Sequence, residues 1–212
     1  YIEAFNELER MTAISVTKDP ASLVVNDSVQ NFRGAPFERS LLHAFTAKNH
    51  LALTNWENSA VEARRLIQSL EPAAKGDYPD DAYSRYMAGF CLEMIGDRSI
   101  AELQYRKAGK LLSYVVIDDK TGRLYAKPKA IGTNAPAAVV FDTEPWENEL
   151  ICFVLIGRSP QGDELLNNER FSKQPMFAEI YSDGKYLGRS YNLADTVDLA
   201  FTTEQKEAAR KF

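Results

Sequence analysis

The sequence has few of the residues that usually carry chemistry or bind nucleic acid. Its 212 residues include 2 cysteines and 2 histidines, and its net charge of -5 at pH 7 comes without any long basic run. Binding to a nucleic-acid backbone needs clustered positive charge, so nucleic acid is excluded as the main partner. No apolar stretch approaches the roughly 18 residues of a membrane-spanning helix, and the longest comparable run is 150–156. These absences predict an acidic globular protein that does not cross a membrane.

The common catalytic and metal-binding motifs are also missing. There is no Cys-x-x-Cys pair, no His-Glu-x-x-His helix, no glycine-rich phosphate loop and no Gly-x-Ser-x-Gly turn. His43 and His50 lie on one expected helix about 10.5 Å apart along its axis, which is too far to bind one metal ion together. Cys91 and Cys152 both lie within apolar patterns, which predicts free and largely buried thiols. We therefore expect no catalysis, no metal and no cofactor.

What the sequence does contain is a long region of helical periodicity. Apolar residues recur every 3.6 positions over residues 37–112, in two pairs of segments divided by the turns Asn55-Trp56 and Gly96-Asp97. We set Gly96 at position 15 of the 34-residue tetratricopeptide pattern. Five residues then fall where the pattern expects small or aromatic side chains: Gly89, Leu92, Ala101, Tyr105 and Ala108. This predicts two tetratricopeptide-like helical hairpins.

The segments on either side of this region have different patterns. Residues 1–14 have the spacing of an amphipathic helix, and residues 17–36 are rich in turn-forming residues, which predicts an extended arm. After Leu112, short β-branched and aromatic runs alternate with turns such as Ser182-Asp183-Gly184-Lys185. The run 150–156 is apolar at nearly every position, which predicts a central strand covered on both faces.

Together these patterns predict an α+β fold in three parts. Residues 1–36 are expected to form the N-terminal helix and arm, residues 37–113 the helical repeats, and residues 114–212 a small, mainly antiparallel β domain with a charged C-terminal segment. The chain begins with Tyr1 rather than Met, so we expect a processed or trimmed product.

The face that helical repeats use for recognition is formed by the first helix of each hairpin. In this sequence it is rich in aromatic side chains, which bury large areas at low entropic cost. The residues predicted to bind protein there are Phe45, Asn49, Tyr83, Tyr86 and Phe90. Two occupants are possible: another protein, or the chain's own arm or β domain.

Two arginines are candidates for specific roles. Arg64 falls at a repeat position where an aromatic side chain normally packs between helices, and a buried guanidinium must be paired. This predicts a structural ion pair with Glu38 or Glu93. Arg158 follows the apolar run 150–156 and could clamp a carboxylate, although bonding to carbonyl groups of its own loop is the simpler interpretation. An enzyme or small-ligand-binding protein with a site near Arg158 therefore remains an alternative.

Four short segments form an ordered set: Ala60-Val61-Glu62-Ala63-Arg64-Arg65, Tyr86-Met87-Ala88-Gly89, Tyr105-Arg106-Lys107-Ala108 and Ile156-Gly157-Arg158-Ser159-Pro160. Together with the Gly96-Asp97 turn, this set resembles a family of uncharacterised bacterial envelope lipoproteins, which carry tetratricopeptide-like repeats followed by a β region. The resemblance spans roughly residues 26–198. It implies a periplasmic protein at the outer membrane, with a lipid anchor upstream and other envelope proteins as partners. The function expected is a non-enzymatic, envelope-associated scaffold or adaptor.

Overall fold

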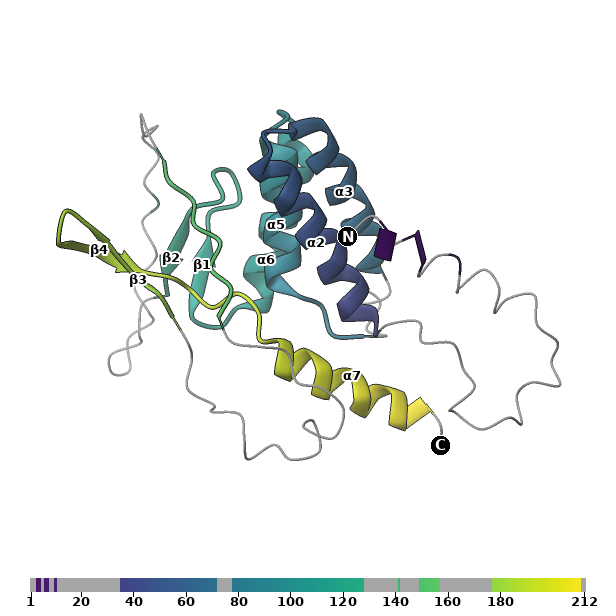
Figure 1. The fold of residues 1–212 in the computed structure, drawn as a ribbon. Coiled ribbons are helices and arrows are strands. Elements are labelled where there is room, and N and C mark those ends of the chain that lie inside the picture. Colours follow the sequence, from purple (N-terminus) through teal and green to yellow (C-terminus); the bar gives the residue numbers. More distant parts are fainter. Residues whose placement is uncertain are drawn as a thin grey trace, which may run out of the picture.

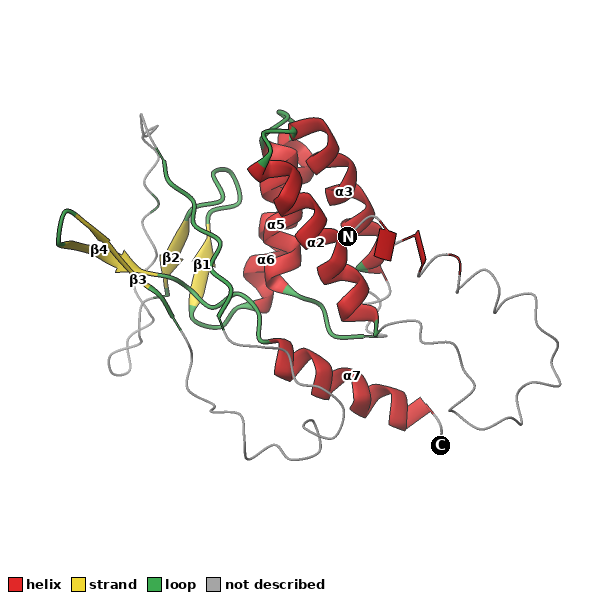
Figure 2. Cartoon of the chain, in the orientation of Figure 1, coloured by secondary structure: helices red, strands yellow, loops and turns green. Residues whose placement is uncertain are grey.

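The structure is a computed structural model that describes residues 35–71, 78–127, 141, 149–156 and 177–210, together with residues 3, 4, 6, 7 and 10. The elements follow in the order α2 (Pro36–Ala52), α3 (Trp56–Ser69), α5 (Ala82–Glu93), α6 (Arg98–Leu111), β1 (Val115–Ile117), β2 (Leu124–Ala126), β3 (Glu179–Ser182), β4 (Lys185–Arg189) and α7 (Thr196–Arg210). Helices α2 to α6 pack together, and two small antiparallel sheets lie to one side of them (Figure 1, Figure 2). The predicted α+β class is confirmed.

The first two helices begin at residues suited to that position. Pro36 occupies the first turn of α2, where no backbone N–H is needed, and the Glu38 carboxylate accepts the Ala35 N–H at 2.7 Å. Asn55 begins α3, and its side-chain oxygen accepts the Asn58 N–H at 3.3 Å. These local bonds explain why the helical periodicity of the sequence becomes helix at these boundaries.

The four central helices pair as two hairpins. α2 packs against α3, α5 packs against α6, and α3 also packs against α5, which joins the hairpins (Figure 1). Gly96 ends the turn after α5 with a φ of 81°, a conformation that favours glycine. Both predicted hairpins are therefore confirmed as helical pairs, and their assignment to the tetratricopeptide pattern stays a prediction.

Small residues allow α5 and α6 to approach closely. A β-carbon added at Gly89 would lie 2.8 Å from Cε1 of Tyr105 and 3.2 Å from the carbonyl oxygen of Ala101. Tyr105 and Ala101 are both buried, as are Ala60 and Ala108. Tyr105 therefore fills the space that the glycine leaves, which is the packing expected from the sequence.

The first sheet belongs to the same core as the helices. β1 pairs antiparallel with β2, and Val115 and Ile117 of β1 lie in the buried cluster that the helices form. The Tyr86 hydroxyl on α5 donates a hydrogen bond of 2.8 Å to the carbonyl oxygen of Gly122, in the turn between the two strands. This bond fixes the turn onto α5.

The second sheet is a tight hairpin of β3 and β4. Its turn residues Asp183 and Gly184 have φ values of 50° and 76°, and positive φ at both positions suits the right-handed twist of the strands. The Asp-Gly hairpin predicted from the sequence is therefore confirmed.

The prediction of a buried central strand over residues 150–156 is wrong. This segment is extended but belongs to neither sheet, and Leu150 is 83% exposed. Within it, Phe153 packs against the core of the helices, whereas its neighbours on both sides stay exposed. An apolar run indicates a preference for burial, but in this segment only the side chain of Phe153 packs against the helices.

The two cysteines have different environments. Cys91 on α5 is buried and free, as predicted, and burial raises its pKa to about 12. Cys152 is free but exposed, so the prediction of a buried thiol is wrong there. Its burial was predicted from the apolar run 150–156, and the other residues of this run are mostly exposed as well.

The charged C-terminal segment forms a helix, which the sequence prediction missed. Asp195 accepts the N–H groups of Val197 and Asp198 at 2.9 and 3.4 Å, as expected at the start of a helix. Leu199 and Ala200 of α7 then pack against Phe37 at the start of α2. Residues 196–200 were assigned to the β domain, and this is corrected to helix.

The predicted N-terminal arm lies almost wholly outside the described residues, and the five described residues before it are helical. Among the helices in the described part of the chain, none has the length and apolar character needed to cross a membrane.

Candidate protein-interaction surface

Three aromatic residues of α5 form a seat for Phe153. Tyr83, Tyr86 and Phe90 share one face of the helix because they are spaced three and four positions apart. The ring centroid of Phe153 lies 6.3 Å from those of Tyr83 and Tyr86, and 5.6 Å from that of Phe90. We call these three residues the aromatic seat and residues 149–156 the strap. The strap therefore covers the α5 part of the predicted groove.

The other two predicted groove residues lie on α2. Asn49 is exposed, and Phe45 is half-buried with the Lys48 ammonium 5.3 Å from its ring centroid. The structure thus places the three α5 residues together under Phe153 and leaves Phe45 and Asn49 on the adjacent helix. The sequence allowed either another protein or the chain itself to cover this surface. For the aromatic seat, the structure shows that the chain itself covers it, through Phe153.

Polar bonds hold the start of the strap. Arg123, which precedes β2, donates to the Glu149 carboxylate through Nε at 2.8 Å and Nη2 at 2.5 Å. Close to Glu149, at the end of α5, the Glu93 carboxylate accepts a hydrogen bond of 2.5 Å from the Tyr105 hydroxyl. Burial raises the pKa of Glu93, and the nearby Glu149 carboxylate adds to this, while the bond from Tyr105 and the charge of Arg98 oppose it. Among the described residues, the strap is held by the Arg123–Glu149 ion pair and by the ring of Phe153.

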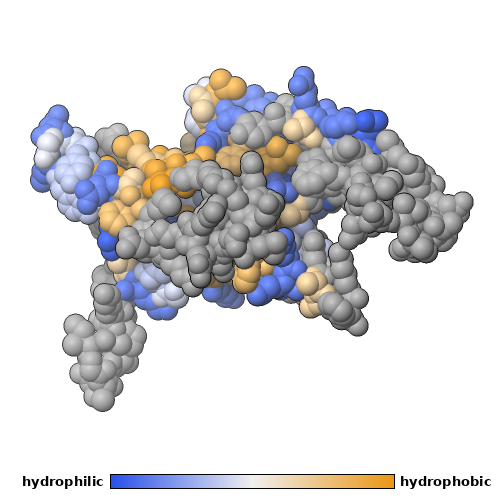
Figure 3. Space-filling model, turned by 60° about the horizontal axis from the view of Figure 1, so that its bottom comes forward, coloured by the Kyte–Doolittle hydropathy of each residue, from blue (hydrophilic) through white to orange (hydrophobic). Residues whose placement is uncertain are grey.

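The remainder of the strap is apolar and exposed. The exposed fractions are 83% for Leu150, 39% for Ile151, 42% for Val154, 54% for Leu155 and 45% for Ile156. Figure 3 shows hydrophobic residues gathered beside the hydrophilic β3–β4 hairpin, on the side of the molecule that carries the strands. Exposed apolar residues gathered in this way typically mark an interaction site.

The backbone of the strap is also available for pairing. Within the described ranges, residues 150–156 make no backbone hydrogen bond to another described residue. An extended segment with free N–H and C=O groups can accept a further strand. The strap thus combines apolar side chains with backbone groups that bond to no other described residue.

The predicted partners of Arg64 are corrected by the structure. The Arg64 side chain is half-exposed and bonds to Asp97 at 3.2 Å. The two glutamates named from the sequence are engaged elsewhere, Glu38 with the Ala35 N–H and Glu93 with Tyr105. The Gly96-Asp97 turn ends beside Arg64, so the ion pair forms at the surface rather than in the core. Arg158 lies outside the described residues.

Arg85 is the buried arginine that sequence reasoning missed. Its side chain is 0% exposed, and its guanidinium bonds to Asp80 at 3.0 Å, to Gln104 Oε1 at 3.2 Å and to the Leu70 carbonyl oxygen at 3.2 Å. It joins the end of α3 to α5 and α6. Asp80, which precedes the helix, was the signal available in the sequence.

The two histidines do not act together. His43 is buried, and its Nδ1 lies 2.9 Å from the Glu62 carboxylate, which also bonds to Arg65 at 2.7 Å. His50 is half-buried in the last turn of α2. In the described part of the chain, no group of three or more His, Cys, Asp or Glu side chains is placed to hold a metal ion.

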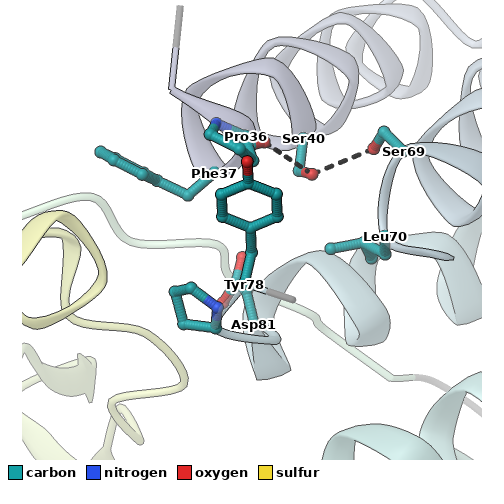
Figure 4. A pocket seen from close by; sticks show the side chains of 8 residues that line it. Pro36, Phe37, Ser40, Ser69, Leu70, Tyr78 and Asp81 are labelled. Carbon is teal, nitrogen blue, oxygen red and sulfur yellow. Dashed lines mark hydrogen bonds between the residues drawn. The ribbon is translucent and has the colours of Figure 1, made fainter. Parts of the chain in front are cut away.

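A pocket at the foot of the helices is too small for a ligand. Its lining residues are Pro36, Phe37, Ser40, Ser69, Leu70, Tyr78, Pro79 and Asp81 (Figure 4). The cavity measures about 10 Å³, which is about the space of one water molecule. The Ser40 and Ser69 hydroxyls bond to each other across it at 3.0 Å. This site therefore serves packing.

No family model matches the chain, and comparisons with curated proteins and with solved structures found no match.

Proposed function

We propose that the protein is a non-enzymatic adaptor or scaffold, and that it binds another protein through the strap. The observation that carries this proposal is the row of exposed apolar side chains from Leu150 to Ile156 on an extended segment that Phe153 anchors to the helices. The helical hairpins provide a rigid base, and the strap is the part presented to the partner.

A protein partner fits this surface better than a small molecule does. Small ligands bind in concave sites of roughly 300–1,000 Å³, and the pocket beneath α2 is far smaller. The strap is instead an exposed apolar segment, and no backbone group of residues 150–156 bonds to another described residue. Strand addition uses both features, because main-chain hydrogen bonds give affinity and alternating side chains give specificity.

The expected mode of binding changes in one respect. The sequence favours a groove on the first helix of each hairpin, and Phe153 already fills the α5 part of it. The strap's outer side replaces that part of the groove as the proposed contact. Phe45 and Asn49 on α2 stay candidates for a secondary contact.

The resemblance to envelope lipoproteins supports the second part of the proposal, a site of action at the periplasmic face of a bacterial outer membrane. Other envelope proteins are the proposed partners there. Fractionation of cells that produce the protein tests this location, and recovery of the protein in the cytoplasmic fraction would contradict it.

The proposed function is tested by placing a charge on the strap. Val154→Lys and Leu155→Lys leave Phe153 in place, and burying an unpaired ammonium in an interface costs several kcal/mol. The immobilised protein is incubated with detergent-solubilised envelope extract, and the retained proteins are identified by mass spectrometry. We expect both variants to lose partners that the wild type retains.

The matched control is Leu53→Lys. Leu53 is exposed just after the end of α2. The substitution therefore also replaces an exposed apolar side chain by lysine, but at a position outside the strap. Equal retention by the wild type and both strap variants would overturn the proposal, and so would the absence of any retained protein.

A further inference from the structure

We infer that the strap is a reversible cover of the aromatic seat, and that it opens and closes while the helical hairpins stay folded. In the closed form, which the structure shows, Phe153 lies on the three rings of the seat. In the open form these rings are uncovered. This motion needs no partner on the exposed residues of the strap, so it goes beyond the proposed function and does not depend on it.

The core of the helices is built without the strap. In the described part of the chain, the buried members of this core are Leu70 and residues of α2, α3, α5, α6 and β1, and none belongs to the strap. Tyr86 is the buried member of the seat, and it has two contacts besides Phe153. Its hydroxyl bonds to the Gly122 carbonyl oxygen at 2.8 Å, and its ring centroid lies 5.2 Å from that of Tyr105. The helical packing therefore remains when Phe153 leaves the seat.

Few contacts hold the strap in the closed form. The Glu149 side chain is 33% exposed, and an ion pair that water reaches contributes little, so the bond to Arg123 is a weak attachment. Among the described residues, no backbone group of 150–156 has a hydrogen-bonded partner, and every residue of this run except Phe153 is exposed. Segments with so few buried contacts open locally at a lower free energy than global unfolding.

The seat is part of the face that the sequence predicts to bind protein. Tyr83, Tyr86 and Phe90 are three of the five residues predicted there, and the closed strap covers them. A partner that binds these rings must displace Phe153, so the fraction of open molecules sets its apparent affinity. In the closed form, the contact of Phe153 with the seat is therefore autoinhibitory.

Cys152 allows the two forms to be observed because it lies next to Phe153. It is exposed, whereas Cys91 is buried with a pKa raised to about 12, so a thiol-specific nitroxide reagent at neutral pH selects Cys152. The motion of a nitroxide at this position is restricted while Phe153 is seated and becomes fast when the strap is open. Electron paramagnetic resonance distinguishes the two.

The test is electron paramagnetic resonance of the labelled full chain without denaturant, with circular dichroism as the measure of helix content. We expect a restricted and a mobile component in the wild type. Phe90→Ala removes one ring of the seat and should shift their ratio about two- to tenfold toward the mobile component, which is the effect of losing one aromatic pair. Phe153→Ala should show the mobile component alone.

Phe177→Ala is the control, because Phe177 is an exposed ring that stacks with Arg189 outside the seat. It should keep the wild-type ratio, and all variants should keep the wild-type helix content. A single restricted component in the wild type, or a ratio that Phe90→Ala leaves unchanged, overturns the inference. Loss of helix content in Phe153→Ala overturns it too, because the strap would then be part of the helical core. The labelled protein is measured alone, so none of these outcomes depends on the retention of envelope proteins.

Discussion

At the scale of single residues, Asp81 has a buried carboxylate whose pKa is raised. It begins α5, and its carboxylate accepts the N–H groups of Tyr83 and Ser84 at 3.0 and 3.1 Å, together with the Ser84 hydroxyl. Burial raises its pKa from 3.8 to about 6, which these hydrogen bonds oppose and the neighbouring Asp80 reinforces. The folded protein therefore binds this proton more tightly than the unfolded chain does.

This raised pKa predicts a loss of stability with rising pH. Between about pH 4 and pH 6 the folded state holds more protons than the unfolded state, so the contribution of Asp81 is complete below pH 4 and is lost as the pH passes 6. The loss is about 3 kcal/mol of unfolding free energy for a shift of this size. Asp81→Asn keeps a capping side chain and removes the titration. Urea denaturation of both proteins from pH 4 to pH 8 measures the difference, and parallel pH profiles would contradict the prediction.

The arginines show what sequence reasoning can and cannot find at this scale. Arg64 and Arg85 both lie in helical segments, and the repeat frame singled out Arg64. The structure buries Arg85 instead, because Asp80, Gln104 and the Leu70 carbonyl all lie within reach of its guanidinium. A helical period identifies the face that a residue occupies, but it does not say which polar groups of other helices meet there.

At the scale of helices, the contact between α5 and α6 depends on the absence of a side chain at Gly89. Gly89→Ala would bring a methyl group to 2.8 Å from Tyr105 Cε1, and we expect a cost on the order of 1–3 kcal/mol from overpacking. Gly109→Ala on α6 is the matched control, because its β-carbon would meet Ile117 Cβ at 3.7 Å, an ordinary contact. Alanine at that position should stabilise the helix by up to about 1 kcal/mol.

Urea midpoints of the two variants separate packing from helix propensity. Helix propensity alone predicts that alanine stabilises both positions. A loss of stability in Gly89→Ala together with a gain in Gly109→Ala therefore requires close packing at Gly89. If Gly89→Ala were more stable than the wild type, α5 and α6 would not pack as closely at Gly89 as described.

The elements predicted correctly share a strong local signal. α2, α3, α5 and α6 have a sustained 3.6 period together with capping or turn residues at their ends, and the Asp183-Gly184 pair specifies its hairpin. α7 was missed because charged residues dominate its second half, and its packing depends on Leu199 and Ala200, near its start. The strap was predicted to be a buried strand because its residues are apolar. The sequence does not show how many other elements pack against such a segment.

At the scale of the whole molecule, Phe153 connects the strap to the helical hairpins. Its ring contacts with the aromatic seat predict energetic coupling between Phe153→Ala and Phe90→Ala. Aromatic pairs contribute about 0.5–1.5 kcal/mol beyond the area they bury, so the double variant should lose about 1 kcal/mol less than the two single losses combined. Urea denaturation of the four proteins gives the coupling energy.

Phe177→Ala combined with Phe90→Ala is the control for this cycle. Phe177 is exposed beside the β3–β4 hairpin and stacks with Arg189 rather than with the aromatic seat. Its effect should be additive with that of Phe90→Ala. Strict additivity for Phe153 and Phe90 as well would mean that the strap is not held by the seat.

The seat could not be assigned from sequence because Phe153 and Phe90 are 63 positions apart. Periodicity showed that Tyr83, Tyr86 and Phe90 share a face and that this face needs cover. Both an internal and an external occupant satisfied that requirement, and choosing between them required the path of the chain between the two parts.

The same separation has a consequence for the order in which the chain is made. Synthesis proceeds from the N-terminus, and domains begin to fold as they leave the ribosome at about 5–20 residues per second. The contacts within α2 to α6 are mostly local, and helical units of this kind fold in microseconds to milliseconds. The receiving surface for Phe153 is formed by helices that precede the strap in the chain, so wherever the chain folds from its N-terminus, the docking site is complete before residues 150–156 reach it.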